Sequence, residues 1–188
     1  MLTVVVRVRI FLHSCPTGKY LATTGNNEES DCVACSTGTY STATGATEIT
    51  TCQQCPAGKY LPTTANDAED DCLDCARGKY SPQDGCSVCT SCVAGTYLDS
   101  TGNDDPGDCV ECETGKYSTV VGAVAAATCQ ECAVGTFSAQ TGASSDATCL
   151  KCTPGKYMES TSASVCTLCF AGKFAMALGA ASATVYRL

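Results

Sequence analysis

The sequence has no tryptophan, one histidine (His13) and few Leu, Ile or Phe residues. Its hydrophobic content of 44% consists largely of Ala, Val and Cys, whose side chains bury little area each. A single large hydrophobic core is therefore not expected, and cross-links, metal ions or repetition must stabilise the chain instead. A lone histidine also leaves no triad and no general acid–base pair, so we expect no enzymatic activity.

Positive charge and long hydrophobic runs are also scarce. The chain has 11 Lys and Arg against 19 Asp and Glu, a net charge of −8, which disfavours nucleic acid as a partner. The N-terminal segment 1–14 is apolar but interrupted by Arg7 and Arg9. It is too short to span a bilayer, and we interpret it as a weak strand or a remnant rather than a clear signal peptide. No membrane insertion by this chain is expected.

Cysteine, by contrast, is abundant, with 18 in 188 residues, as in disulfide scaffolds. Those that precede a Gly-x-aromatic triplet begin a repeat, and they are Cys15, Cys35, Cys55, Cys75, Cys92, Cys112, Cys132, Cys152 and Cys169. The intervals run 20, 20, 20, 17 and then repeat. The sequence therefore predicts a first four-repeat block at 15–91, a second at 92–168, and an incomplete ninth repeat with a tail at 169–188.

Each repeat reads C-x-x-G-[KT]-[YF], often with a second glycine seven residues after the first. The first glycine would permit a positive φ or a close approach of another chain segment. The aromatic residue is the one large apolar group in each repeat, and we expect it to pack on a disulfide or on the next aromatic ring.

Acidic turns precede the closing cysteine of some repeats, at 26–31, 66–71 and 103–108. None matches the EF-hand loop, which requires Gly at position 6 and Glu at position 12. We interpret them as solvated turns rather than as calcium sites, and we expect no cofactor.

Eight C-x-x-C pairs allow two chemistries besides disulfide formation. Neighbouring pairs have the spacing of a zinc ribbon, and on that interpretation one Cys₄ site comprises Cys32, Cys35, Cys52 and Cys55. The repeat pattern argues against zinc, because all intervals between the C-x-x-C pairs are equivalent and the pattern begins with the single Cys15. An intracellular zinc-binding C-x-x-C interaction protein is nevertheless the alternative interpretation. The second chemistry is iron–sulfur, because the run CSVCTSC at 86–92 resembles the start of a ferredoxin site.

Disulfide bonds explain the single cysteine at the start. If each cysteine before Gly-x-aromatic bonds to the first cysteine of the following C-x-x-C, every bond closes a short local ring. The pairs are then Cys15–Cys32, Cys35–Cys52, Cys55–Cys72, Cys75–Cys89, Cys92–Cys109, Cys112–Cys129, Cys132–Cys149 and Cys152–Cys166. Each ring is expected to contribute about 3 kcal/mol in the chain-entropy model. Cys86 and Cys169 are left without partners.

The extra cysteine is explained by aligning the two short repeats. CARGKYSPQDGCSVCTSC (75–92) matches CTPGKYMESTSASVCTLC (152–169) without a gap, and Cys86 falls on Ala163. No fourth ligand with ferredoxin spacing follows Cys92, so the iron interpretation loses its basis. Cys86 either competes with Cys89 for Cys75 or stays free for an intermolecular bond.

The repeated pattern resembles the ephrin type-A/B receptor-like cysteine-rich repeat, and it is similar to the simplest cysteine-rich module of tumour-necrosis-factor receptors. CPTGKY, CPAGKY and CTPGKY carry the resemblance best, and it covers residues 15 to about 174. It implies a small, disulfide-rich, mainly β and irregular fold: an elongated, solenoid-like rod of tandem single-disulfide repeats without a large core.

The resemblance also implies a non-enzymatic module at the cell surface or outside the cell, which acts as a spacer or binds a protein or other ligand. Ligand residues do not carry over, because in the family they lie in variable loops, so the protein or glycan partner is not identified. The lack of a clear signal peptide and the missing closing cysteine of the ninth repeat suggest a fragment or an incomplete gene model of a larger exported protein. We expect that parent protein to be membrane-anchored.

Overall fold

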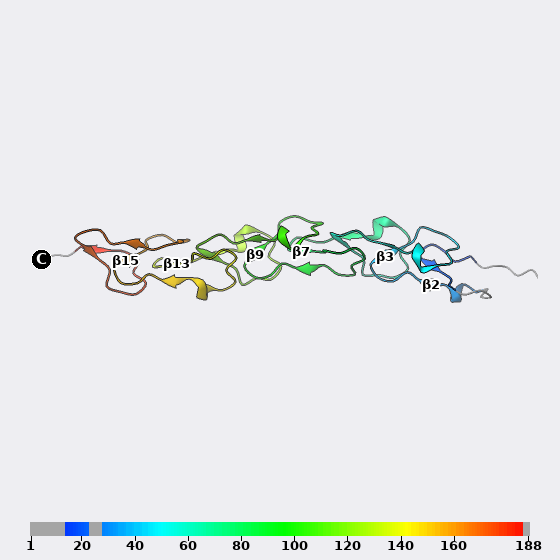
Figure 1. Ribbon diagram of the computed structural model, residues 1–188, viewed down its shortest axis with the longest axis horizontal. Coiled ribbons are helices and arrows are strands. Elements are labelled where there is room, and N and C mark those ends of the chain that lie inside the picture. The colour runs from blue at the N-terminus through cyan, green and yellow to red at the C-terminus, as the bar shows by residue number, and fades with distance from the viewer. Residues whose placement is uncertain (1–13, 23–27, 186–188) are drawn as a thin grey trace, which may run out of the picture. The chain divides into compact units, whose positions relative to one another are not determined.

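The computed structural model describes residues 14–22 and 28–185, so the strand expected over 1–14 lies outside it except for Ser14. Each repeat forms one antiparallel pair of two-residue strands (Figure 1). The first strand is the Lys/Thr–aromatic pair after the glycine, and in the first eight repeats the second strand lies between the two cysteines of C-x-x-C. The pairs are β1 (Lys19–Tyr20) with β2 (Val33–Ala34), β3 (Thr39–Tyr40) with β4 (Gln53–Gln54), β5 (Lys59–Tyr60) with β6 (Leu73–Asp74), β7 (Lys79–Tyr80) with β8 (Thr90–Ser91), β9 (Thr96–Tyr97) with β10 (Val110–Glu111), β11 (Lys116–Tyr117) with β12 (Gln130–Glu131), β13 (Thr136–Phe137) with β14 (Leu150–Lys151), β15 (Lys156–Tyr157) with β16 (Thr167–Leu168), and β17 (Lys173–Phe174) with β18 (Thr184–Val185).

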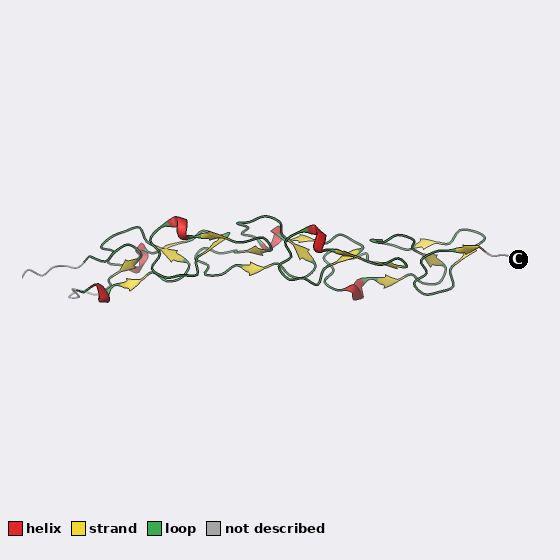
Figure 2. Cartoon of the chain, turned by 180° about the vertical axis from the view of Figure 1, so that it is seen from behind, coloured by secondary structure: helices red, strands yellow, loops and turns green. Residues whose placement is uncertain are grey.

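A three-residue 3₁₀ turn precedes the closing cysteine of every 20-residue repeat (Figure 2). These turns are η1 (Glu29–Asp31), η2 (Ile49–Thr51), η3 (Glu69–Asp71), η4 (Pro106–Asp108), η5 (Ala126–Thr128) and η6 (Asp146–Thr148). The two 17-residue repeats, at 75–91 and 152–168, contain no such turn. The three-residue difference in repeat length therefore corresponds to one 3₁₀ turn, and both repeat lengths form the same strand pair.

Backbone hydrogen bonds join consecutive repeats, and we call this set the inter-repeat ladder. Between the first two repeats, amides donate to carbonyls in the pairs Gly18 to Ser41 (2.8 Å), Leu21 to Ala46 (2.9 Å) and Gly45 to Cys15 (2.7 Å). The fifth and sixth repeats use the equivalent pairs Gly95 to Ser118, Leu98 to Ala123 and Gly122 to Cys92. Because buried backbone groups must be paired, the ladder replaces the extended sheet that strands of two residues are too short to form.

Contacts divide the chain into two compact units. The first ends at Asp74 and also includes Ser81–Cys89, and the second comprises Cys75–Tyr80 and the residues from Thr90 onward. The division therefore runs through the repeat at 75–91, and the two four-repeat blocks stay a prediction.

The buried residues are mainly half-cystines. The first cysteine of each closed repeat is at most 2% exposed, namely Cys15, Cys35, Cys55, Cys75, Cys92, Cys112, Cys132 and Cys152. The residue after the aromatic is also buried in most repeats, as at Ser41, Leu61 and Leu98. Of the nine aromatic residues in the Gly-x-aromatic triplets, only Tyr40 is buried, and the others are partly exposed. The predicted disulfide-rich, mainly β repeat fold without a large core is confirmed.

The first glycine of each repeat has a positive φ, for example +79° at Gly38. It also faces the repeat two positions further along the chain, because a Cβ at Gly38 would lie 1.9 Å from the carbonyl oxygen of Gly85. Gly172, with the same φ of +79°, has nothing within 4 Å of an added Cβ. Glycine is therefore required for two separate reasons in most repeats and for one reason at the end of the chain.

Candidate functional site

The disulfides place the predicted cysteines in rings that each close a single repeat. The structure contains Cys15–Cys32, Cys35–Cys52, Cys55–Cys72, Cys92–Cys109, Cys112–Cys129, Cys132–Cys149 and Cys152–Cys166. Their Cα–Cα distances of 5.5 to 5.8 Å are those of ordinary disulfides. Cys75 and Cys89 are disulfide-bonded as well, and Cys86 and Cys169 are free thiols.

A disulfide sulfur offers no thiolate to a metal ion, and thiolate is the form in which cysteine binds zinc. Within residues 14–22 and 28–185, no three His, Cys, Asp or Glu side chains converge on a point where a metal could bind. The arrangement of the cysteines is thus that of structural cross-links, in which the first cysteine of each bond is buried.

Cys86 takes part in the inter-repeat ladder through its backbone carbonyl and not through its side chain. Its oxygen accepts from the amide of Leu61 at 3.0 Å, just as the oxygen of Ala163 accepts from Ser138 at 2.9 Å. The thiol is partly exposed and has no role in that bond. The alignment of Cys86 with Ala163 therefore corresponds to equivalent positions in the fold.

Cys169 opens the ninth repeat, which forms the β17–β18 pair although it has no closing cysteine. In the eighth repeat Tyr157 pairs with Thr167, the residue after Cys166, and in the ninth Phe174 pairs with Thr184. Ala183 thus occupies the place of a closing cysteine, and the ladder suffices to form this strand pair.

The acidic turns use their carboxylates to satisfy backbone amides. Oδ2 of Asp71 accepts from the amides of Asp67 (3.2 Å) and Ala68 (3.1 Å), and Oδ2 of Asp108 accepts from the amide of Asp105 at 3.2 Å. These bonds cap the 3₁₀ turns from within. The sequence signal of this capping role is the Asp at the third position of the turn, which the interpretation as a solvated turn does not use. Residues 26 and 27 of the first acidic turn lie outside the described residues.

Grooves of one kind recur where an aromatic residue lies beside the next repeat. Each is lined by that aromatic, by the residue before the next aromatic, by the first residue of the 3₁₀ turn, and by the closing cysteine. The three sets are Tyr20 with Thr39, Ile49 and Cys52; Tyr80 with Thr96, Pro106 and Cys109; and Tyr97 with Lys116, Ala126 and Cys129. Their volumes are 290, 580 and 180 Å³, respectively. The groove is therefore a recurring feature of the repeat backbone. Lining residues that differ between repeats give each groove a different chemistry.

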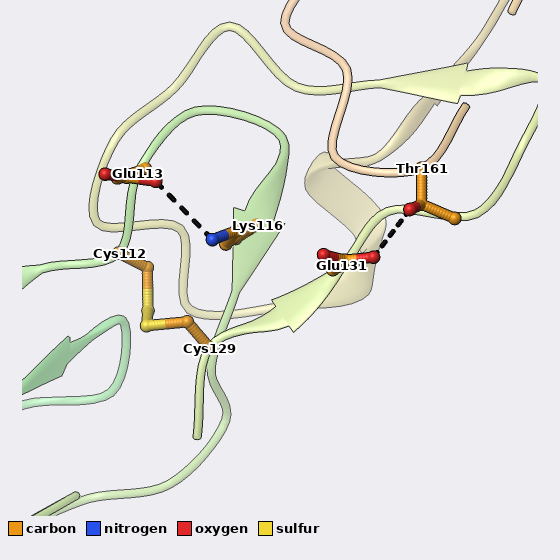
Figure 3. A network of polar contacts seen from close by, with 6 residues as sticks. All are labelled: Cys112, Glu113, Lys116, Cys129, Glu131 and Thr161. Carbon is orange, nitrogen blue, oxygen red and sulfur yellow. Dashed lines mark hydrogen bonds and ion pairs between the residues drawn. A yellow bond between two sulfur atoms is a disulfide. The ribbon is translucent and has the colours of Figure 1, made fainter. Parts of the chain in front are cut away.

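Polar side chains make contacts within and between repeats on the exposed surface near the Cys112–Cys129 bond (Figure 3). Thr161 donates to Oε2 of Glu131 at 2.5 Å, and Lys116 pairs with Glu113 at 3.4 Å. The hydrogen bond from Thr161 is the main cause that lowers the pKa of Glu131, and the positive charge of Lys116 acts in the same direction. Because this surface is exposed, such contacts tune local order more than global stability.

Comparison with known proteins agrees with the repeat chemistry. The family described as tyrosine-protein kinase ephrin type A/B receptor-like matches residues 63–109, which span the end of the third repeat, the fourth repeat and most of the fifth. Over these residues the chain is similar to an ephrin-receptor-like cysteine-rich repeat. No curated protein matches the chain. Repeats of this kind are non-catalytic ectodomain-type modules, and their disulfide bonding fits an extracellular location. Among the described residues, none of the helical segments has the length and apolar character of a membrane span.

Proposed function

We propose that these ephrin-receptor-like repeats form an extracellular, non-enzymatic module that spaces and displays binding surfaces. The observation that supports the proposal is that one disulfide closes each of the first eight repeats, while the ladder joins each repeat to the next. Such a design resists unfolding without a core. It lets grooves of the same backbone form carry different side chains, as binding modules require.

The compartment is tested by producing the full chain in two ways. With a heterologous export signal, the proposal expects a secreted protein with two free thiols among its 18 cysteines. The same chain kept in the cytosol is expected to be reduced and unfolded. A folded, fully reduced cytosolic protein that contains stoichiometric zinc would instead establish the intracellular zinc-binding alternative.

The spacing role is tested by removing residues 112–151, which are two complete repeats. Every remaining cysteine of the closed repeats then keeps its partner. If the chain is a spacer, its longest dimension, measured by small-angle scattering, should decrease in proportion to the number of repeats removed. Its cross-section should stay the same. Reduced and alkylated full-length protein serves as the unfolded reference. An unchanged longest dimension in the shortened, fully oxidised chain would refute the spacing role.

A further inference from the structure

The largest of the three grooves described above lies in the second unit, between Tyr80 and η4 (Pro106–Asp108). Its volume of 580 Å³ is in the range of ligand-binding clefts. It adjoins the groove beside Tyr97, because Val110 and Glu111 line both grooves. We call these two adjoining grooves together the Tyr80–Tyr97 groove.

The walls of this groove include apolar side chains that the fold leaves in solvent. Val93 is 68% exposed and Val110 is 48% exposed, and the ring of Tyr80 is partly exposed beside them. Pro106 adds a rigid apolar wall at the start of η4. Apolar side chains gathered in a concave surface are typical of a binding site.

Acidic side chains predominate around the groove, although Lys116 lines its end beside Tyr97. Residues 90–115 contain no Lys, Arg or His, but six acids, namely Asp99, Asp104, Asp105, Asp108, Glu111 and Glu113. Glu111, which lines the groove, accepts from the hydroxyl of Thr141, and Asp105, which precedes the lining residue Pro106, accepts from the amide of Gly107. Both donors are neutral. A neutral donor leaves the negative charge of a carboxylate uncompensated. Of these six acids only Glu113 has a basic partner among the described residues, Lys116.

We infer that the Tyr80–Tyr97 groove binds an extended basic peptide segment of a partner protein, in which Lys or Arg residues alternate with apolar side chains. The apolar residues pack on Val93, Pro106 and Val110, and the cations lie against the ring of Tyr80 and the carboxylate of Glu111. This inference deepens the proposed function, on which it rests, by assigning one binding surface and its partner chemistry.

Other occupants fit the groove less well. A second copy of this chain, with its net charge of −8, would bring further negative charge to an acidic surface. A metal ion would need converging ligands, and the described residues contain no such group. An open, elongated groove with charge on its rim suits an extended peptide instead.

The test uses the oxidised full chain and labelled nonapeptides of fixed sequence. The binding probe is (Gly-Lys-Leu)₃, and the comparison probes are (Gly-Glu-Leu)₃ and (Gly-Lys-Ser)₃, measured by fluorescence polarisation at low and high salt. We expect saturable binding of the first probe, little binding of the other two, and weaker binding as salt screens the charges.

Two pairs of variants locate the site. Glu111→Gln is matched by Glu131→Gln, because each glutamate precedes a repeat-opening cysteine and accepts from a threonine 30 residues further on. Val110→Ser is matched by Leu150→Ser, an equally placed exposed residue. Glu111→Gln and Val110→Ser should each weaken binding by about tenfold, and the matched variants by less than twofold. A free-thiol count of two in every variant verifies folding.

Several outcomes overturn the inference: no saturable binding, equal binding of the glutamate peptide, equal losses in the matched variants, or protein self-association in place of peptide binding. These outcomes leave the spacing role standing, because secretion, thiol count and chain dimension test that role separately.

Discussion

Gly38 and Gly172 have the same backbone conformation but different surroundings, and this pair separates two roles of the repeat glycine. Both have φ of +79°, yet only Gly38 faces the backbone of the repeat two positions further along the chain. The sequence predicts a positive φ or a close approach at this glycine, and the structure shows both at Gly38. A regular interval in a sequence gives the length of a repeat, but it does not show which repeats lie in contact.

Gly38→Ala should therefore be much more damaging than Gly172→Ala. The φ alone costs about 1–2 kcal/mol in each variant. At Gly38 the added Cβ also lies 1.9 Å from the oxygen of Gly85, and overpacking brings the total to about 3 kcal/mol or more. Thermal unfolding of the two oxidised variants measures the difference. Equal destabilisation would show that contacts between alternate repeats contribute nothing.

Glu131 offers a residue-scale prediction about pH. Its pKa is lowered chiefly by the hydrogen bond from Thr161. The bond therefore stabilises the folded state at pH values above the pKa that Glu131 has in the unfolded chain. That contribution is lost as pH falls through the lower, folded pKa. Thr161→Val should raise the pKa of Glu131 towards its ordinary value in an NMR titration of the carboxyl carbon. Thr148→Val, which removes a hydroxyl bonded to the carbonyl of Ser145, should leave it unchanged.

At the scale of the element, the two-residue strand pair is the constant unit, and the 3₁₀ turn and the disulfide are additions to it. The 17-residue repeats form the pair without a 3₁₀ turn, and the ninth repeat forms it without a disulfide. The repeat pattern predicts the length of each repeat, and the resemblance implies a mainly β fold, whereas the structure places the strands at Gly-x-aromatic and within C-x-x-C. The sequence could not predict that the residue after the aromatic is more buried than the ring, since that depends on the neighbouring repeat.

The ninth repeat can be closed by one substitution. Ala183→Cys places a thiol where the eighth repeat has Cys166, and it should pair with Cys169. The number of free thiols should fall from two to one, and the closed loop should stabilise this repeat by about 3 kcal/mol. Thiol labelling followed by mass spectrometry gives the count, and hydrogen exchange at the β18 amides gives the stabilisation. Ala180→Cys is the control, because position 180 accepts a ladder bond from Met158 and should yield a third free thiol.

At the scale of the whole molecule, covalent rings and backbone hydrogen bonds replace the hydrophobic core that the composition cannot supply. The candidate grooves follow from the same design, because an aromatic residue lies beside the next repeat at each of them. Their lining residues are close only after folding, so sequence spacing alone does not reveal them. The disulfide pairing, by contrast, can be predicted from the cysteine spacing, since closure within a single repeat is the simplest pairing that uses the single first cysteine.

Peptide mapping under non-reducing conditions tests the central claim most directly, namely that each ring closes one repeat. The account predicts two free thiols, at Cys86 and Cys169, and cross-linked peptides that join cysteines within a repeat, such as Cys35–Cys52 and Cys132–Cys149. Cys86→Ala should leave that map unchanged with one free thiol. Cross-links that mainly skip a repeat, or a map that rearranges in Cys86→Ala, would contradict the account.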